Sequence, residues 1–136
     1  MSAASVTAAS GVVDVRSDGA VSVLTLAAPP LNLLTQDLRR AIRSAIEAAA
    51  SDTSVRAIVL TGAPNFCAGA DLKEFAARSD PAVAEAHCRN GHAMALALAC
   101  CDKPTIVAIE GACLGGGFEL ALGCDVRIAA RDARLG

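Results

Sequence analysis

The chain has 136 residues, a formal net charge of −2, 54% hydrophobic residues and 2% aromatic residues. With no cluster of Lys or Arg and neither Trp nor Tyr, it lacks the basic surface and stacking side chains of nucleic-acid-binding proteins, and the charge that attracts a protein to an anionic membrane. No run approaches the roughly 18 uninterrupted apolar residues of a membrane span, so the composition indicates one small domain without a nucleic-acid or membrane partner.

The first part of the chain predicts a tail, a hairpin and a loop. Residues 1–10 are rich in Ser and Ala, and we expect them to form a disordered tail. Residues 11–16 and 20–26 are strand-like runs on either side of Ser17-Asp18-Gly19, which is a hairpin signal. Two prolines within residues 27–34 remove backbone donors and fix φ, so this segment is predicted to be an irregular loop.

An amphipathic helix is predicted to follow, with Thr35 as its N-cap. Apolar residues recur along it at three- and four-residue spacing, which gives the helix one apolar face and one charged face. The predicted buried face consists of Leu38, Ile42, Ala45, Ile46 and Ala49. The predicted solvent face carries Arg39, Arg40, Arg43 and Glu47.

A second strand, loop and helix come next. Residues 55–61 predict a buried strand, which a turn connects to a loop with the sequence NFCAGADLKE. Asp80 is predicted to cap a helix that has Pro81 at its first position and runs to about Cys101. Residues 105–109 then return as a strand. Strands that alternate with helices indicate an α/β architecture with much of the sheet buried.

The stretch 109–130, IEGACLGGGFELALGCDVRIAA, has the pattern of a ligand site. A strand ends near Glu110, three glycines from 115 to 117 make a bend without side chains, and residues 118–123 are predicted to start a helix that carries Glu119. Free N–H groups at a helix start carry partial positive charge, so an oxyanion can bind there. Glu119 would lie about one helical turn from the amide of Gly116. The stretch therefore predicts one donor and one base.

Two segments carry a family resemblance: FCAGADLK at residues 66–73 and GACLGGGFELALGCD at residues 111–125. Together they resemble the signatures of the enoyl-CoA hydratase/isomerase (crotonase) superfamily, and weaker similarity extends from about Val12 to the last residue. The resemblance implies an α/β, crotonase-like fold, a spiral of β-β-α units. Residues 11–136 would be its N-terminal part, without the C-terminal helical region.

The resemblance also implies a substrate and a site. The ligand would be an acyl-CoA thioester, whose carbonyl gains enolate character during reaction and is held by two backbone N–H groups. Matching the motifs places these donors at Ala70 and Gly116 and a catalytic glutamate at Glu119. One such donor is typically worth about 100- to 1000-fold in rate. The implied substrate-binding residues are Ala68, Ala70, Asp71, Leu72, Lys73, Gly115 and Gly116, with Lys73 available for a phosphate of coenzyme A.

The implied reaction is syn addition of water to a 2-enoyl-CoA, with no cofactor beyond the coenzyme A of the substrate. Two glutamates share this work in a hydratase, and the second is expected about twenty residues after Glu119, in a segment that begins like Ala133-Arg134-Leu135-Gly136. Because the sequence stops at Gly136, we expect these 136 residues alone to show no hydration of crotonyl-CoA. A homotrimer or hexamer is expected at full length.

Other interpretations of these residues remain open. Within the family, the reaction could be an enoyl-CoA isomerisation or another enolate-forming step. Outside it, the chain could be a non-catalytic fragment that binds coenzyme A or joins an assembly. The glycine bend by itself is typical of a tight turn, and Glu119 by itself would suit a helix N-terminus. Asp71 and Asp125 could be structural groups that pair with nearby backbone, and Lys73 could be a solvated surface lysine.

The six cysteines are interpreted as reduced, small apolar residues of a cytoplasmic protein, because the sequence shows no signal-peptide pattern. Cys67 lies in a motif loop, where it could be a nucleophile but better fits core or pocket lining. Cys88 and His92 are four residues apart, with His87 adjacent, so a helix could place two ligands on one face, but no third or fourth ligand at suitable spacing supports a metal site.

Overall fold

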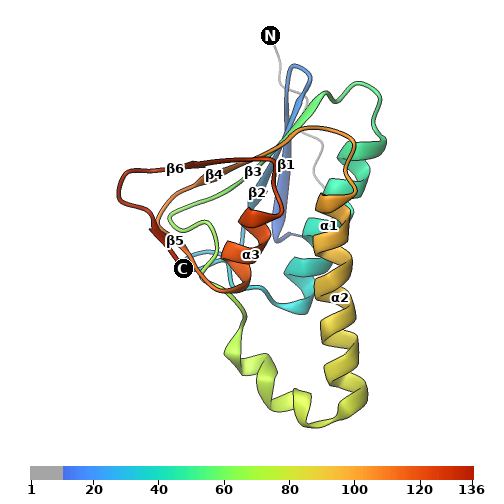
Figure 1. Cartoon of the computed structure of the whole chain (residues 1–136), viewed down its shortest axis with the longest axis vertical. Helices are drawn as coiled ribbons and strands as arrows, with labels where there is room; N and C mark the ends of the chain where they lie inside the picture. Colours follow the sequence, from blue (N-terminus) through green and yellow to red (C-terminus); the bar gives the residue numbers. More distant parts are fainter. Residues whose placement is uncertain (1–10) are drawn as a thin grey trace.

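Five strands form one mixed sheet with the order β1-β2-β3-β4-β6 in the computed structural model, which describes residues 11–136 (Figure 1). The strands are β1 (Val13–Asp18), β2 (Val21–Leu26), β3 (Ala57–Gly62), β4 (Thr105–Ile109) and β6 (Val126–Ala129). β1 and β2 pair antiparallel, and every later neighbour pairs parallel. A second sheet joins β5 (Ala112–Cys113) to β7 (Arg134–Leu135). The predicted tail, residues 1–10, lies outside the described residues.

The hairpin and the loop after it agree with the sequence, except at the turn. Ser17 and Asp18 belong to β1, so the connection consists of Gly19 and Ala20. Gly19 has a φ of +56°, which glycine adopts without steric cost, and the turn begins two residues later than predicted.

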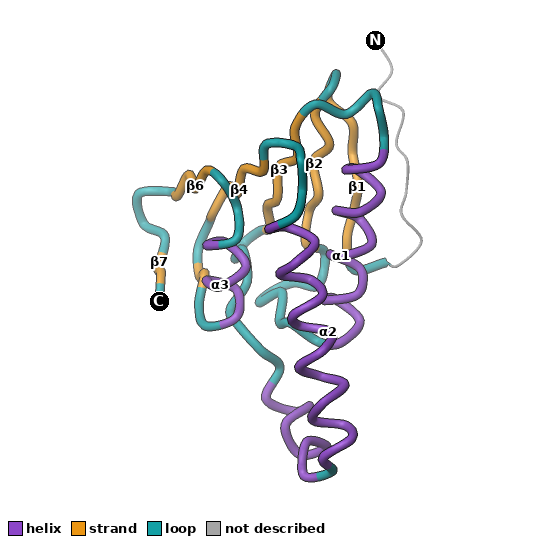
Figure 2. The backbone as a smooth tube through the Cα atoms, turned by 45° about the vertical axis from the view of Figure 1, so that its right-hand side comes forward, coloured by secondary structure: helices purple, strands orange, loops and turns teal. Residues whose placement is uncertain are grey.

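Two long helices lie side by side, and the first of them packs against the sheet (Figure 2). In α1 (Gln36–Ser51), the Thr35 hydroxyl accepts a hydrogen bond from the amide of Leu38 at 3.1 Å, which confirms the predicted N-cap. In α2 (Pro81–Ala99), the Asp80 carboxylate accepts from the amide of Ala82 at 2.9 Å, so this predicted start is also confirmed. α1 contacts β1 and β2 as well as α2. No helix within residues 11–136 has the length and apolar character that crossing a membrane requires.

The core lies between α1 and the sheet. All five residues of the predicted apolar face of α1 are buried. The predicted solvent face is wrong at one position, because Arg39 is only 8% exposed. α2 covers that flank of α1, and the sequence of α1 alone contains no information about this second neighbour.

Four short elements were not predicted from the sequence. Residues Leu72–Ser79 form a 3₁₀ helix, η1, between the first motif loop and α2. β5 and β7 have two residues each, too few to show a periodicity, and all four residues of β6 are exposed, so β6 lacks the alternation of a half-buried strand.

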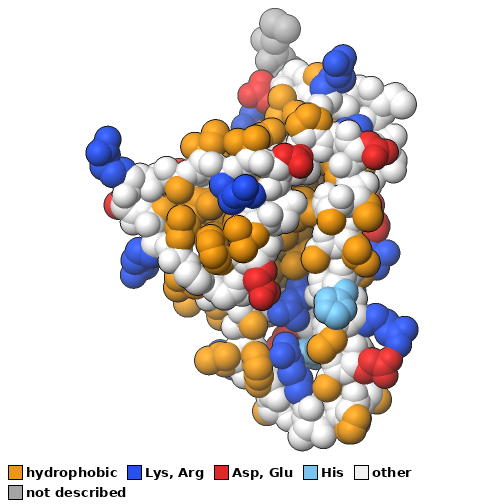
Figure 3. Space-filling model, viewed as in Figure 1, with side chains coloured by type: hydrophobic (Ala, Val, Ile, Leu, Met, Phe, Trp, Pro, Cys, Tyr) orange, Lys and Arg blue, Asp and Glu red, His pale blue; other side chains and the backbone are white. Residues whose placement is uncertain are grey.

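One face of the molecule exposes apolar side chains near β6 and α3 (Gly116–Leu122), as Figure 3 shows. The exposed residues there are Leu114, Leu122, Val126, Ile128 and Leu135. Contiguous exposed apolar surface often marks a region that another segment or chain covers.

Candidate active site

The two motif loops, separated by more than forty positions in the sequence, lie side by side. Cys67 and Cys113 form an isolated parallel bridge. The amide of Cys67 donates to the carbonyl oxygen of Ala112 at 3.0 Å, and the amide of Leu114 donates to the carbonyl oxygen of Cys67 at 3.0 Å. We call residues 66–70 and 113–116 the site loops. These backbone bonds hold the two site loops together at the ends of β3 and β5.

The site loops also come close to each other at two glycines, Gly69 and Gly115. A Cβ placed on Gly69 would lie 3.1 Å from the carbonyl oxygen of Leu114 and 3.9 Å from the Cα of Gly115. Their φ values are +103° and +50°, in the region that favours glycine. Gly69 and Gly115 directly precede Ala70 and Gly116, so the peptide units that carry these two amides begin at neighbouring points.

The amides of Ala70 and Gly116 are both free to bind a ligand. Within residues 11–136, neither amide donates to a backbone or side-chain acceptor, although the amides of Gly115 and Gly117 on either side of Gly116 are both bonded. Gly116 is the first residue of α3, where an amide has no acceptor inside the helix. Each of the two site loops therefore contains one backbone donor without a partner.

The carboxylate of Glu119 lies close to Gly116. A Cβ placed on Gly116 would lie 3.9 Å from Oε2 of Glu119, so the carboxylate and the free amide share one end of α3. The Glu119 side chain is exposed. The structure thus places Gly116 and Glu119 at the same end of α3, and Ala70 lies in the other site loop, directly after Gly69.

The helix starts two residues earlier than predicted, and the reason is the packing of Gly117. A Cβ on Gly117 would lie 2.7 Å from the Cβ and 2.8 Å from the Sγ of Cys67, and closer still to its carbonyl oxygen. Only a glycine allows α3 to begin directly against the first site loop. The contact joins the two site loops through the helix itself.

Two asparagines fix the loops behind the site, and the sequence analysis missed both. The Asn65 side chain accepts from the amide of Ala112 at 2.8 Å and donates to the carbonyl oxygen of Pro30 at 2.8 Å. The fully buried Asn32 donates to the carbonyl oxygen of Asn65 at 2.8 Å and accepts from the amide of Ala28 at 2.8 Å. Their partners are backbone groups of distant segments, so no local pattern identifies them.

Asn65→Ala should lower the free energy of unfolding by about 2 kcal/mol, because two hydrogen bonds worth about 1 kcal/mol each are lost. Chemical denaturation measures this difference. Ser79→Ala, which removes one exposed hydrogen bond to Ala76, is the matched control and should change stability by less than about 0.5 kcal/mol. Equal stabilities of the Asn65 variant and the parent chain would show that these bonds do not hold the site loops.

The predicted coenzyme A segment is partly structural. Oδ1 of Asp71 accepts from the amide of Lys73 at 3.0 Å and caps η1, which confirms the structural interpretation of Asp71. Leu72 and Lys73 are exposed, and Leu72 is 76% exposed. Ala68 donates its amide to the carbonyl oxygen of Leu31 at 2.9 Å, so this residue positions the loop and has no free donor.

Asp125 is structural as well. Its Oδ2 accepts from the amide of Thr105 at 2.8 Å and from its hydroxyl at 2.9 Å. These two bonds lower the pKa of Asp125. They tie the end of α3 to the start of β4.

A pocket of about 280 Å³ opens beside Gly116 and Glu119. It lies between α3, α1 and α2, and Figure 3 shows Lys or Arg and His side chains in the hollow between α3 and α2. The pocket is lined by Leu34, Arg39, Arg78, His87, Cys88, Gly91, His92, Met94, Ala95, Leu98, Gly116, Glu119, Leu120 and Gly123. Its polar wall, formed by Arg39, Arg78 and the two histidines, was missed by sequence reasoning.

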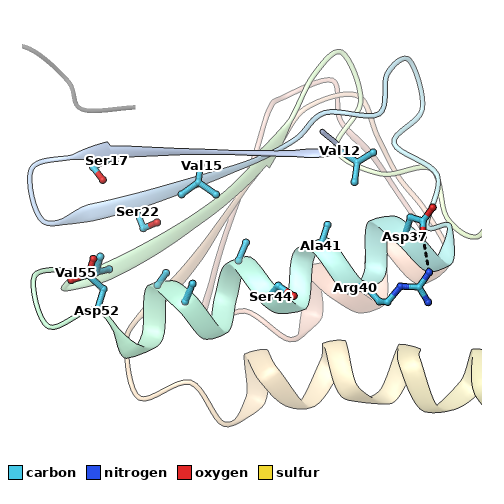
Figure 4. Close-up of a pocket in the computed structure, with 13 residues that line it drawn as sticks. Val12, Val15, Ser17, Ser22, Asp37, Arg40, Ala41, Ser44, Asp52 and Val55 are labelled. Carbon is cyan, nitrogen blue, oxygen red and sulfur yellow. Dashed lines mark hydrogen bonds and ion pairs between the residues drawn. The ribbon is translucent and has the colours of Figure 1, made fainter. Parts of the chain in front are cut away.

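A larger pocket, of about 690 Å³, lies elsewhere (Figure 4). It is a groove between the β1–β2 hairpin and α1, and none of the predicted site residues lines it. Of its three charged lining residues, Asp37 and Arg40 pair with each other at 2.6 Å, and Asp52 accepts hydrogen bonds from Ser54. The charged groups of the groove are therefore engaged with neighbouring residues.

The cysteines are free, and three of them are buried. Burial raises the pKa of Cys67 to about 11. A thiol that is fully buried and protonated is a poor nucleophile, so the alternative of a nucleophilic Cys67 is wrong and its assignment to the core is confirmed. Among residues 11–136, no group of three or more His, Cys, Asp or Glu side chains is arranged to hold a metal ion.

Cys88, Cys100 and Cys101 should react with iodoacetamide within a short pulse, whereas Cys67, Cys113 and Cys124 should stay unmodified. The first three are exposed or half-buried, and burial raises the pKa of each of the others. Peptide mass spectrometry reads the modification at each position, and the same pulse in guanidinium chloride should label all six. Labelling of Cys67 as fast as Cys100 in the folded chain would contradict the buried packing of the first site loop.

The chain is similar in sequence to proteins of one family. A family profile described as "Enoyl-CoA hydratase/isomerase" matches residues 16–136. The chain is 44% identical over 119 residues to a peroxisomal bifunctional enzyme of Danio rerio, covering 85% of this chain and 15% of that protein. It is 39% identical over 120 residues to a probable enoyl-CoA hydratase of Bacillus subtilis (strain 168), covering 88% of this chain and 46% of the relative.

Solved structures share the fold. An enoyl-CoA hydratase/carnithine racemase from Magnetospirillum magneticum superposes with a TM-score of 0.88 at 33% identity, covering 92% of this chain and 48% of the other. The chain therefore spans about half the length, or less, of the proteins it matches.

Proposed function

Because the chain belongs to the enoyl-CoA hydratase/isomerase family, we propose that the protein to which these residues belong hydrates a 2-enoyl-CoA thioester. The observation that carries the proposal is the juxtaposition of two unpaired amides, at Ala70 and Gly116, beside the Glu119 carboxylate. An acyl-CoA thioester is the substrate class that suits a pair of fixed donors, because its carbonyl oxygen gains negative charge as the reaction proceeds.

The proposed chemistry assigns each of these groups a task. The amides of Ala70 and Gly116 hold the thioester oxygen, and they need no reorganisation when it becomes an enolate oxygen. Glu119 holds a water molecule and accepts one of its protons while the water oxygen bonds to the β-carbon. The α-carbon then takes up a proton, which a second carboxylate would supply in a hydratase of this type. Among the described residues that line the 280 Å³ pocket, Glu119 is the one with a carboxylate.

The remaining predictions follow from the same family. Ala68, Asp71, Leu72 and Gly115 would shape the approach to the site, and the exposed Lys73 would meet a phosphate of coenzyme A. No cofactor is needed beyond the coenzyme A of the substrate. A homotrimer or hexamer and a cytoplasmic location stay predictions from the resemblance.

An enoyl-CoA isomerisation is the second candidate within the family. The position of Glu119 at the free amide of Gly116 favours hydration, because an isomerase can move its proton with one later carboxylate alone. The products distinguish the two: a hydratase converts crotonyl-CoA to 3-hydroxybutyryl-CoA, whereas an isomerase shifts the double bond of a 3-enoyl-CoA. A binding or assembly fragment is a third candidate, favoured by the exposed apolar face near β6.

Binding of butyryl-CoA and of its S-butyl thioether, which lacks the carbonyl oxygen, tests the proposed function. Calorimetry should show the thioester binding about 10- to 100-fold more tightly, because two hydrogen bonds of about 1 kcal/mol or more are available to it alone. Equal affinities would overturn the assignment of the Ala70 and Gly116 amides. Absence of binding by both compounds would overturn acyl-CoA recognition by these residues altogether.

A further inference from the structure

One charged residue of α1 is buried without a partner. Arg39 is 8% exposed and lines the same 280 Å³ pocket as Gly116 and Glu119. None of the ion pairs within residues 11–136 includes its guanidinium group, and no side-chain hydrogen bond there does either. The enclosed side-chain atoms without a hydrogen-bond partner within residues 11–136 are Gln36 Nε2 and Glu74 Oε2, so the guanidinium nitrogens of Arg39 keep contact with the solvent. A guanidinium group in a pocket wall without a protein partner can pair with an anionic ligand that enters the pocket.

The charged neighbours of Arg39 leave it available. Arg78, which also lines the pocket, donates from Nε to Nδ1 of His87 at 3.1 Å, and its guanidinium lies 4.0 Å from the centre of the Phe75 ring. Glu74 is an acidic competitor for the ligand: its Oε1 accepts from the amide of Gln36 at 3.0 Å, and its enclosed Oε2, 4.0 Å from His87 Nδ1, accepts no hydrogen bond within residues 11–136.

The electrostatic balance of the wall is positive. Burial and the charge of Arg78 lower the pKa of Arg39, and the charge of Glu74 opposes them. Glu74 does not line the pocket, so two guanidinium groups and one carboxylate, Glu119, face its interior. His92 also lines the pocket.

The pocket is large enough for a short acyl chain, and Gly116 lies at one of its walls. At about 30 Å³ for each water-sized group, 280 Å³ holds roughly nine such groups. Gly116, whose amide is proposed to bind the thioester oxygen, lies at one wall, and Arg39 contributes to the same cavity from α1. An acyl chain that starts at Gly116 therefore extends into a space whose wall contains a guanidinium group.

We propose that this pocket binds a carboxylate at the far end of the acyl chain, so that the preferred substrates are CoA thioesters of short dicarboxylic acids, with Arg39 as the residue that pairs with the carboxylate. This inference rests on the proposed function and names its substrate class. A guanidinium group matches a carboxylate with two parallel N–H···O bonds. Hydrogen bonds to charged groups are worth about 1.5–3 kcal/mol, which corresponds to roughly 10- to 150-fold in affinity.

Titration calorimetry with glutaryl-CoA and valeryl-CoA, which have acyl chains of equal length, tests the proposal. The chain should bind glutaryl-CoA at least about tenfold more tightly. Arg39→Met should reduce the ratio of the two affinities to about one, and Arg39→Lys should leave an intermediate ratio because the ammonium group keeps the charge without the planar fork. Arg43→Met, on the exposed side of α1 in an ion pair with Glu47, is the matched control and should keep the parent ratio.

Each outcome decides a different question. Tight binding of valeryl-CoA with no preference for glutaryl-CoA overturns the carboxylate site and leaves the proposed function standing. Failure to bind either compound overturns both. A preference for glutaryl-CoA that survives in a folded Arg39→Met variant, checked by circular dichroism, overturns the role of Arg39 and assigns it to structural pairing with Glu74.

Discussion

Gly117→Ala is expected to lower the free energy of unfolding by about 3 kcal/mol or more, the upper range for overpacking of a close contact. The added methyl group would lie 2.7 Å from the Cβ and 2.8 Å from the Sγ of Cys67, and it would also meet the carbonyl oxygen of Cys67. Rotation of the Cys67 side chain moves neither its Cβ nor its carbonyl oxygen, so it cannot relieve the contact. Either the first site loop or the start of α3 must move. Denaturant unfolding followed by circular dichroism measures the loss.

Gly91→Ala is the matched control for this substitution. Gly91 lies inside α2, and a Cβ placed on it would meet nothing within 4 Å. Alanine is favoured over glycine in a helix interior, so Gly91→Ala should raise the free energy of unfolding by about 0.5–1 kcal/mol. If the Gly117 variant is as stable as the Gly91 variant, the two site loops are not joined through α3.

Gly69→Ala should weaken binding of butyryl-CoA about 10- to 100-fold, since a residue forced into a glycine conformation costs about 1–3 kcal/mol. Gly69 has a φ of +103°, and its Cβ would lie 3.1 Å from the carbonyl oxygen of Leu114. Relief of that contact separates the site loops and moves the amides of Ala70 and Gly116 apart. Calorimetric titration of the folded variant measures the change in affinity.

The S-butyl thioether of coenzyme A provides the control ligand for Gly69→Ala. It has no carbonyl oxygen, so its affinity should change by less than about threefold if the variant disturbs the two donors alone. A parallel loss for both ligands would indicate general damage to the coenzyme A site, and no loss for either would separate Gly69 from ligand binding.

The elements with strong local signals were predictable from the sequence. Thr35 and Asp80 mark their helix starts because each has a capping side chain, and α1 shows its apolar face through regular spacing. The crotonase-like α/β fold, predicted from the two motifs, is confirmed by solved structures such as that from Magnetospirillum magneticum. Capping side chains, apolar spacing and the two long motifs were therefore sufficient to predict these helix starts and the fold.

The errors arose where distant segments meet. Arg39 looks like a solvent residue within α1, and only the packing of α2 over that flank buries it. The three glycines from 115 to 117 are alike in sequence, but their roles differ: one has positive φ, one has a free amide and one packs against Cys67. The polar wall of the pocket combines α1, η1 and α2, and therefore has no sequence signature.

The infrared spectrum of bound butyryl-CoA with a ¹³C-labelled thioester carbonyl tests most directly whether the amides of Ala70 and Gly116 act on one oxygen atom. Two hydrogen bonds polarise the C=O bond, so the carbonyl band should move to lower frequency when the ligand binds, and the shift should shrink in Gly69→Ala. A carbonyl band at saturation that coincides with that of the free ligand would contradict the account.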